Sequence, residues 1–181
     1  LGKMGFEYTI LPVDDKGMVS PADLEAAIRP ETILATIMFA NNEIGTIQPV
    51  KELGEVCRRR GVMFHVDGVQ AAGHIMIDIQ QLPVDMMTMA AHKMYGPKGL
   101  GALYVRKGIK LIPTLHGGGQ EFGLRSGTEN VPGIVGFGVA AEIAKERLAR
   151  GDDKKLARLR DYFIDGVLSR IPESHLTGAV G

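Results

Sequence analysis

Residues 33–70, ILATIMFANNEIGTIQPVKELGEVCRRRGVMFHVDGVQ, contain the pattern that decides the fold class. The continuous apolar run at 33–40 predicts a strand buried on both faces of a sheet. The amphipathic stretch at 50–60 predicts a helix closed by Gly61, and residues 62–66 predict a second strand. Strand, helix and strand at this spacing are typical of a right-handed crossover between parallel strands.

The pattern continues on the C-terminal side. Residues 85–90 (DMMTMA) and 101–105 (GALYV) predict two further strands. Residues 132–150 and 154–171 predict two helices, separated by Gly151 and two aspartates. The order of elements predicts an α/β fold, in which helices cover both faces of a mostly parallel sheet.

Composition excludes several classes of function. The chain has 181 residues, of which 45% are hydrophobic and 23% charged, as in ordinary globular proteins. Lysine plus arginine equals aspartate plus glutamate at 21 each, so no basic surplus favours nucleic acid or an anionic membrane. No apolar run approaches the roughly 20 residues of a membrane span. The single cysteine excludes an internal disulfide and fits a reducing compartment, so we expect a cytoplasmic protein.

Polar side chains follow three of the predicted strands. Asn41, Asn42 and Glu43 follow the first strand, Asp67 and Gln70 the second, and His92 and Lys93 the third. In sheets of this kind, ligands bind beyond the carboxyl ends of the strands. We therefore expect these side chains to meet in one pocket.

Lys93 and Asp67 are the residues best suited to chemistry. A lysine between a buried strand and a glycine-rich turn can lose its solvation, which makes the amine a better nucleophile for a carbonyl. The alternative is a solvated loop lysine, and Lys98 in the following turn is a weaker candidate of the same kind. A carboxylate such as Asp67 can hold a cationic ring nitrogen, although aspartate is also a common helix N-cap.

Other candidates have simpler explanations. His65 shares a strand face with Asp67, and we expect a packed or hydrogen-bonded core histidine. Cys57 lies on the apolar face of the predicted helix, which favours a buried hydrophobe over a nucleophile. The glycines at 117–119, together with residues 126–128, could approach a phosphate, but a flexible turn is the simpler interpretation. The sequence has no metal-binding motif and no GxSxG elbow.

Four segments in order, NNEIGTIQP (41–49), FHVDGVQ (64–70), AHKMYGPKG (91–99) and HGGGQEFGLRSGTENVPGIVG (116–136), resemble the cysteine desulfurase family over nearly the whole chain. The resemblance implies the large domain of a fold type I transferase that binds pyridoxal 5'-phosphate and forms a homodimer. It also implies conversion of L-cysteine to L-alanine, with sulfur passed as a persulfide to an acceptor or iron–sulfur scaffold protein. Residues 1–150 would belong to the large domain, and 151–181 would begin a smaller one.

The resemblance also assigns roles to residues. Lys93 would bind the cofactor aldehyde, and Asp67 would pair with the ring nitrogen. Gln70 and Asn42 would lie at the phenolic oxygen of the ring, Asn42 also near the substrate carboxylate. The phosphate would contact Ala90, Ala91 and His92, and Thr128 would reach the phosphate of the other subunit. Arg125 lies in the same loop as Thr128, without an assigned role.

Three features depart from the family pattern. Ala90 stands where the family usually has serine or threonine, which predicts the loss of one hydrogen bond to the phosphate. Gly68 stands where alanine is commoner. The family's sulfur-accepting cysteine lies beyond position 181 and Cys57 does not match it. Because the chain also begins at Leu1, we expect a fragment of a longer protein that is inactive by itself. The alternatives are another enzyme of the same fold, such as a selenocysteine lyase or aminotransferase, or a catalytically idle chain.

Overall fold

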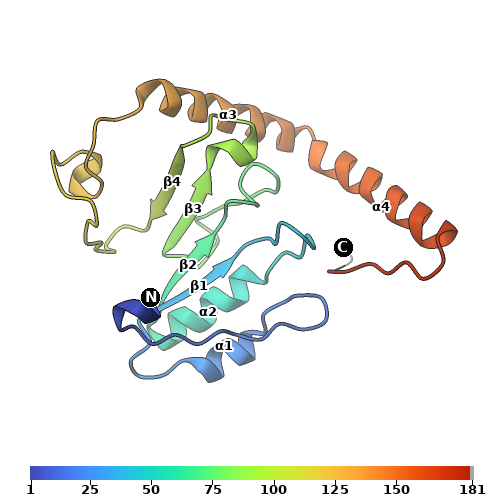
Figure 1. The fold of residues 1–181 in the computed structure, drawn as a ribbon, viewed down its shortest axis with the longest axis horizontal. Coiled ribbons are helices and arrows are strands. Elements are labelled where there is room, and N and C mark those ends of the chain that lie inside the picture. The colour runs from blue at the N-terminus through green and yellow to red at the C-terminus, as the bar shows by residue number, and fades with distance from the viewer. Residues whose placement is uncertain (180–181) are drawn as a thin grey trace.

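A four-stranded sheet organises the chain, for which the computed structural model describes residues 1–179 (Figure 1). The strands are β1 (Leu34–Met38), β2 (Met63–Asp67), β3 (Met86–Ala90) and β4 (Gly101–Val105), and they lie in sequence order. β1, β2 and β3 are parallel, whereas β4 runs antiparallel to β3. A parallel neighbour needs a crossover of about a dozen residues or more, and the connection from β3 to β4 is too short to contain one. The predicted mostly parallel sheet is confirmed.

Within the described part of the chain, the α-helices are α1 (Pro21–Ala27), α2 (Val50–Arg60), α3 (Val131–Ala149) and α4 (Asp152–Arg170). Short 3-10 helices, η1 (Gly2–Met4), η2 (Ala91–Met94) and η3 (Glu121–Gly123), lie in the connections. α2 has the predicted bounds. Gly61 ends it in the left-handed conformation, at a φ of 68°, and its N–H is hydrogen-bonded to carbonyls of the last turn. That conformation is the reason for glycine at this position.

The break between α3 and α4 differs slightly from the prediction. Gly151 adopts a left-handed φ of 74°, but Asp152 and Asp153 lie in the first turn of α4 rather than in the break. Acidic side chains stabilise the N-terminal turn of a helix through the helix dipole, which explains their position. The assignment of residues 151–181 to a second domain stays a prediction.

The main core lies between the sheet and the helices α1 and α2. Ala35, Ile37, Phe64 and Val66 point from the strands into this core and pack with helix residues such as Leu53. Alternate residues of β1 point the other way.

On its second face β1 is open. Leu34 and Thr36 are exposed there, so the prediction that residues 33–40 are buried on both faces is wrong for β1. β1 is one of the two edge strands of the sheet described for residues 1–179, and its inner face alone meets the core formed with α1 and α2.

A second, smaller core joins α3 to the loops beyond the strands. Ala140 and Ala144 of α3 pack with Ala72 and Met94, and Figure 1 shows α3 crossing above the ends of β3 and β4. α4 continues away from the sheet in the same view and has no buried residue. Within residues 1–179, no helix is both long enough and apolar enough to cross a membrane.

Candidate active site

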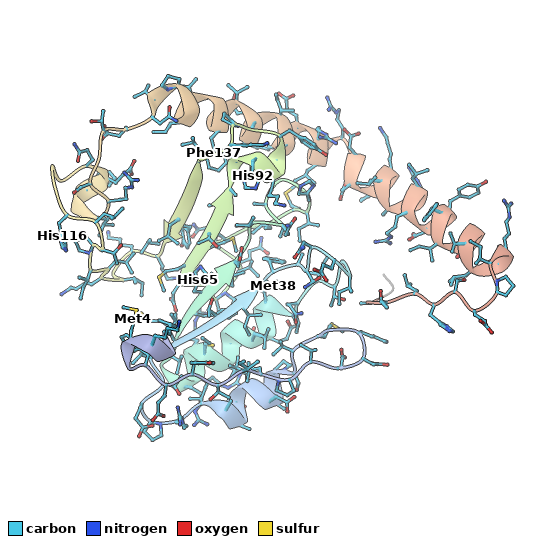
Figure 2. All side chains as sticks on the ribbon, viewed as in Figure 1. Met4, Met38, His65, His92, His116 and Phe137 are labelled. Atoms are coloured by element: carbon cyan, nitrogen blue, oxygen red, sulfur yellow. The ribbon has the colours of Figure 1, made fainter. Side chains whose placement is uncertain are left out.

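The carboxyl ends of β1, β2 and β3 meet at one edge of the sheet. The register pairs Met38 with Asp67 and Asp67 with Thr88, so Asp67 lies between the two neighbouring strand ends. Figure 2 shows Met38 at the end of β1 and His92 just beyond β3, below α3. The segments that carry Asn42, Gln70 and Lys93 all begin at this edge. That their side chains meet in one pocket stays a prediction.

Asp67 is held by one oxygen and leaves the other available. Its Oδ1 accepts hydrogen bonds from the Val69 N–H at 3.0 Å and from the Thr88 hydroxyl at 3.4 Å. Within residues 1–179, Oδ2 accepts no hydrogen bond from the protein. A carboxylate with one anchored and one available oxygen can bind a protonated ring nitrogen in a fixed orientation. Between β2 and β3 the described chain has no helix, so Asp67 is not a helix N-cap, and its bond with the Val69 N–H closes a turn instead.

The turn after β1 separates the roles of two neighbouring asparagines. Asn41 is structural, because its Oδ1 accepts the N–H groups of Glu43 and Ile44 at 2.8 and 3.0 Å. The Asn41 N–H is also bonded to the carbonyl of the buried Thr46. Asn42 is exposed at the tip that these bonds fix, so its side-chain amide can bind a ligand.

Lys93 lies in η2, between two buried anchors. Ala91 is fully buried and Met94 is nearly so, while Lys93 itself is half-buried. Within residues 1–179, the Lys93 amine has neither an ion pair nor a hydrogen bond with the protein. Lys98, the weaker candidate, is exposed on the turn that follows. An amine that no carboxylate pairs with is available to attack a carbonyl.

The residues predicted at the phosphate divide into two groups. The Ala91 N–H donates to the Leu100 carbonyl at 3.1 Å, so this amide supports the turn. Ala90 is half-buried at the end of β3 and His92 is exposed, and these two have atoms at the surface beside Lys93. No hydroxyl is present at position 90, where the family pattern would supply one.

The glycine-rich loop lies apart from these strand ends. Figure 1 places it on the outer side of β4, and Figure 2 shows His116 there. The loop is exposed, and it is closed by hydrogen bonds from the Gly127 N–H to Gln120 and from Arg125 to the Ser126 carbonyl. Because β4 is antiparallel, it returns the chain to the opposite edge of the sheet before this loop begins. The structure therefore does not bring Thr128 to the site of its own chain, and its role at a second subunit stays a prediction.

His65 is a hydrogen-bonded residue of the sheet. Its Nδ1 lies 2.6 Å from the Thr36 hydroxyl on the neighbouring strand. Burial lowers the pKa of His65 below its ordinary value, and the nearby Asp67 carboxylate offsets part of that shift. The imidazole is therefore mostly neutral at pH 7. The predicted hydrogen-bonded histidine is confirmed, but its place in the core is wrong, because Phe64 and Val66 face the core and alternation turns His65 to the opposite face of the sheet.

Cys57 is a buried thiol of α2. Its side chain is 1% exposed. Burial, reinforced by the Asp85 carboxylate, raises the pKa of Cys57 to about 11. Only the thiolate is a competent nucleophile, so Cys57 is inert at neutral pH, as the sequence predicted.

Two further residues near this edge were not among the predicted ones. Thr88 bonds Asp67, and strand alternation from Ala90 could have placed it on the same face. His74 lies 2.6 Å from the Lys93 carbonyl through Nε2, and no sequence pattern indicated this contact. Within residues 1–179, no three His, Cys, Asp or Glu side chains are grouped as a metal site.

The available Asp67 oxygen, the half-buried Lys93 amine and the exposed Asn42 amide form a donor and acceptor set that suits an aldehyde cofactor with a cationic ring. Comparison with known proteins agrees with this class. The family model for the class-V aminotransferases matches residues 2–180, and the chain belongs to this family.

Within that family, the chain is similar to cysteine desulfurases. It is 52% identical over 178 residues to the cysteine desulfurase IscS of Clostridium botulinum, covering 98% of this chain and 45% of that protein. Among solved structures, a NifS-like protein is 44% identical with a TM-score of 0.88, covering 93% of this chain and 46% of that one. SspA in complex with cysteine is 46% identical with a TM-score of 0.76, covering 78% and 41%. The chain thus spans less than half the length of these proteins.

Proposed function

We propose that the protein carrying this chain is a pyridoxal-phosphate-dependent cysteine desulfurase. The observation that carries the proposal is that the segments with Asp67 and Lys93 follow neighbouring parallel strands at one sheet edge, in a chain 52% identical to a curated cysteine desulfurase. The substrate is L-cysteine, the ligand named in the complex of the similar SspA. The products are L-alanine and an enzyme-bound persulfide.

Each strand end contributes one function. The Lys93 amine would hold the cofactor through its aldehyde and, when free of it, could move a proton at the substrate carbon. Asp67 would keep the ring nitrogen protonated, with Thr88 and the Val69 N–H fixing the orientation of its carboxylate. Gln70 and Asn42 would hold the phenolic side of the ring and the substrate, and Ala90 and His92 would hold the phosphate. When bound, the cofactor supplies an electron sink for the substrate carbon.

The sulfur step needs a second nucleophile. A cysteine thiolate of the enzyme attacks the sulfur of the substrate and forms an S–S bond, while the carbon–sulfur bond breaks and its electron pair stays with carbon. Protonation of that carbon gives alanine, and the sulfur remains as a persulfide. Cys57 is unsuited to this role because its thiol is buried and its pKa is about 11. The nucleophile therefore comes from another part of the protein.

The whole protein would act as a homodimer in the cytoplasm and pass its sulfur to an acceptor or iron–sulfur scaffold protein. Thr128 supports the dimer, because its loop lies apart from the strand ends of its own chain. An exposed loop of this kind can reach the site of a second subunit.

The test is Lys93→Ala in the full-length protein, with Lys98→Ala as the matched control on the neighbouring turn. Alanine formation from cysteine should vanish in the first variant and persist in the second, and the visible absorbance of the bound cofactor should follow the same pattern. Retained alanine formation in Lys93→Ala would contradict the proposal. Bound cofactor together with keto-acid formation, or with a preference for selenocysteine, would indicate another enzyme of the same family.

A further inference from the structure

His74 links the two segments that carry the candidate cofactor residues. It lies in the turn after β2, on the segment that also carries Asp67 and Gln70. Its Nε2 lies 2.6 Å from the main-chain carbonyl of Lys93 beyond β3, and both groups are partly buried. A carbonyl only accepts hydrogen bonds, so Nε2 carries the hydrogen and donates it.

The carbonyl that His74 reaches belongs to a turn with few bonds of its own. η2 is a short 3-10 helix, and the N–H groups of Tyr95 and Gly96 both return to the Ala91 carbonyl. Carbonyls at the end of a helix have no partner inside it and need one from elsewhere. Tyr95 leaves the helix at a φ of 66°, which is unfavourable for a residue with a side chain. The turn that carries Lys93 therefore depends on hydrogen bonds from other segments, such as the bond from His74.

His74 is itself held firmly in place. The main-chain N–H of His74 donates a hydrogen bond to the Ala71 carbonyl at 3.0 Å. Its ring meets Tyr95 edge-on, with the centroids 6.4 Å apart, and the Arg147 guanidinium of α3 lies 5.4 Å from the Tyr95 ring centroid.

The glycine before it allows this approach. Gly73 has a φ of 81°, and a Cβ there would lie 2.9 Å from the Met94 Cβ. Gly73 thus lets the turn that carries His74 lie directly against η2.

From these contacts we propose that His74 is a positioning residue for Lys93, which it orients through the Lys93 carbonyl and ties to the segment of Asp67. The inference rests on the proposed function, because it concerns the lysine that would bind the cofactor. It concerns the orientation of the Lys93 amine and not the choice of substrate, which other residues determine.

The test compares wild-type, His74→Phe and His74→Gln proteins at full length. Phenylalanine keeps a ring beside Tyr95 without a hydrogen-bond donor, whereas glutamine keeps an N–H donor. His74→Leu is a second variant without a donor. His116→Phe, in the exposed glycine-rich loop, is the control. Three quantities are measured with added pyridoxal phosphate: its dissociation constant, its visible circular dichroism, and the fraction trapped on Lys93 by borohydride. The unfolding midpoint of the cofactor-free protein is measured as well.

Loss of one hydrogen bond should weaken cofactor binding about three- to tenfold in His74→Phe and His74→Leu. Loss of the hydrogen bond should also change the circular dichroism band of the cofactor. In His74→Gln, both the affinity and the band should return to the wild-type values. An unchanged band and affinity in the donor-free variants would overturn the inference, as would an equal fall in the unfolding midpoint of all three variants with the band unchanged. Trapping on wild-type Lys93 without alanine formation would refute only the proposed reaction, whereas no trapping would refute both.

Discussion

Gly68 and Met87 are packed so closely that a methyl group on Gly68 would lie 2.9 Å from Met87 Cγ and 3.0 Å from its Sδ. The Thr88 carbonyl would lie 3.1 Å away on the same side. Met87 is 2% exposed and cannot swing into solvent. Glycine at position 68 and a long side chain at position 87 are therefore matched, directly beside Asp67.

Gly68→Ala should accordingly destabilise the protein by about 1–3 kcal/mol, the usual cost of overpacking a core. Urea unfolding of the single variants, of Met87→Ala and of the double variant measures the coupling. We expect the double variant to lose less than the sum of the single losses, by about 0.5 kcal/mol or more. Gly138→Ala is the control, since a methyl group at this position in α3 would meet no atom within 4 Å. Simple additivity would refute the steric relationship.

Arg106 should stabilise the entry to β3. Its guanidinium donates to the carbonyls of Leu82 and Val84 at 2.7–3.0 Å and lies 3.7 Å from Asp85. Asp85 in turn accepts the Phe64 N–H at 2.9 Å. Replacing Arg106 by methionine keeps most of the stem but leaves these acceptors unpaired.

The expected loss for Arg106→Met is about 1.5–3 kcal/mol of unfolding free energy, the range for hydrogen bonds to a charged group. Lys107→Met, at an exposed neighbouring position, should change stability by no more than about 0.5 kcal/mol. Chemical denaturation of both variants tests the difference. Equal stability of the two would show that the Arg106 bonds contribute nothing net.

Cys57 should make stability fall at alkaline pH. Its folded pKa of about 11 lies above the ordinary value of 9.0, so the unfolded chain loses this proton first as pH rises. The contribution of the protonated Cys57 thiol to the free energy of unfolding is therefore fully present below pH 9 and is lost between about pH 9 and 11. Wild-type and Cys57→Ala proteins compared across this window isolate the effect, because all other groups titrate in both. At pH 8, iodoacetamide should label wild-type Cys57 no faster than the protein opens, and rapid labelling would contradict the buried thiol.

Ala90→Ser should strengthen cofactor binding. Position 90 is half-buried at the end of β3 and lacks the hydroxyl that the family pattern places on the phosphate. A charge-assisted hydrogen bond contributes about 1.5–3 kcal/mol, which corresponds to about 10- to 100-fold in affinity. Titration of the full-length apoenzyme with pyridoxal phosphate measures the gain, and Ala102→Ser on the neighbouring strand is the control. Unchanged affinity in Ala90→Ser would show that the phosphate needs no donor there.

Much of this arrangement follows from local sequence rules. Periodicity alone predicted α2 and β4 with their observed bounds, and Gly61 marked the end of its helix because only glycine adopts that φ without strain. The placement of Asn42, Asp67 and Lys93 after three strands that end at one edge followed from a general property of parallel sheets, since their carboxyl ends share one edge. The roles of these residues came from family resemblance, which periodicity could not supply.

Other features depend on contacts between distant segments. The His74–Lys93 bond joins residues 19 positions apart across two strand ends, and no local pattern predicts such a pairing. The open face of β1 was missed because an apolar run indicates what a strand can bury, not which helices are present to cover it. Thr128 shows the same limit, because its distance from Lys93 depends on the reversal of direction between β3 and β4.

The strand order β1-β2-β3-β4 bears on how the chain folds as it is synthesised. Every strand pairs with its neighbour in sequence, so no pairing closes a loop longer than one crossover, and the entropic cost of loop closure grows only slowly with loop length. The sheet can therefore grow strand by strand, with the core formed with α1 and α2 completed before α3 and α4 exist. α4, which buries no residue, adds little to that nucleus. Its amides should exchange with solvent long before those of β2, whose Phe64 and Val66 lie at the centre of the core.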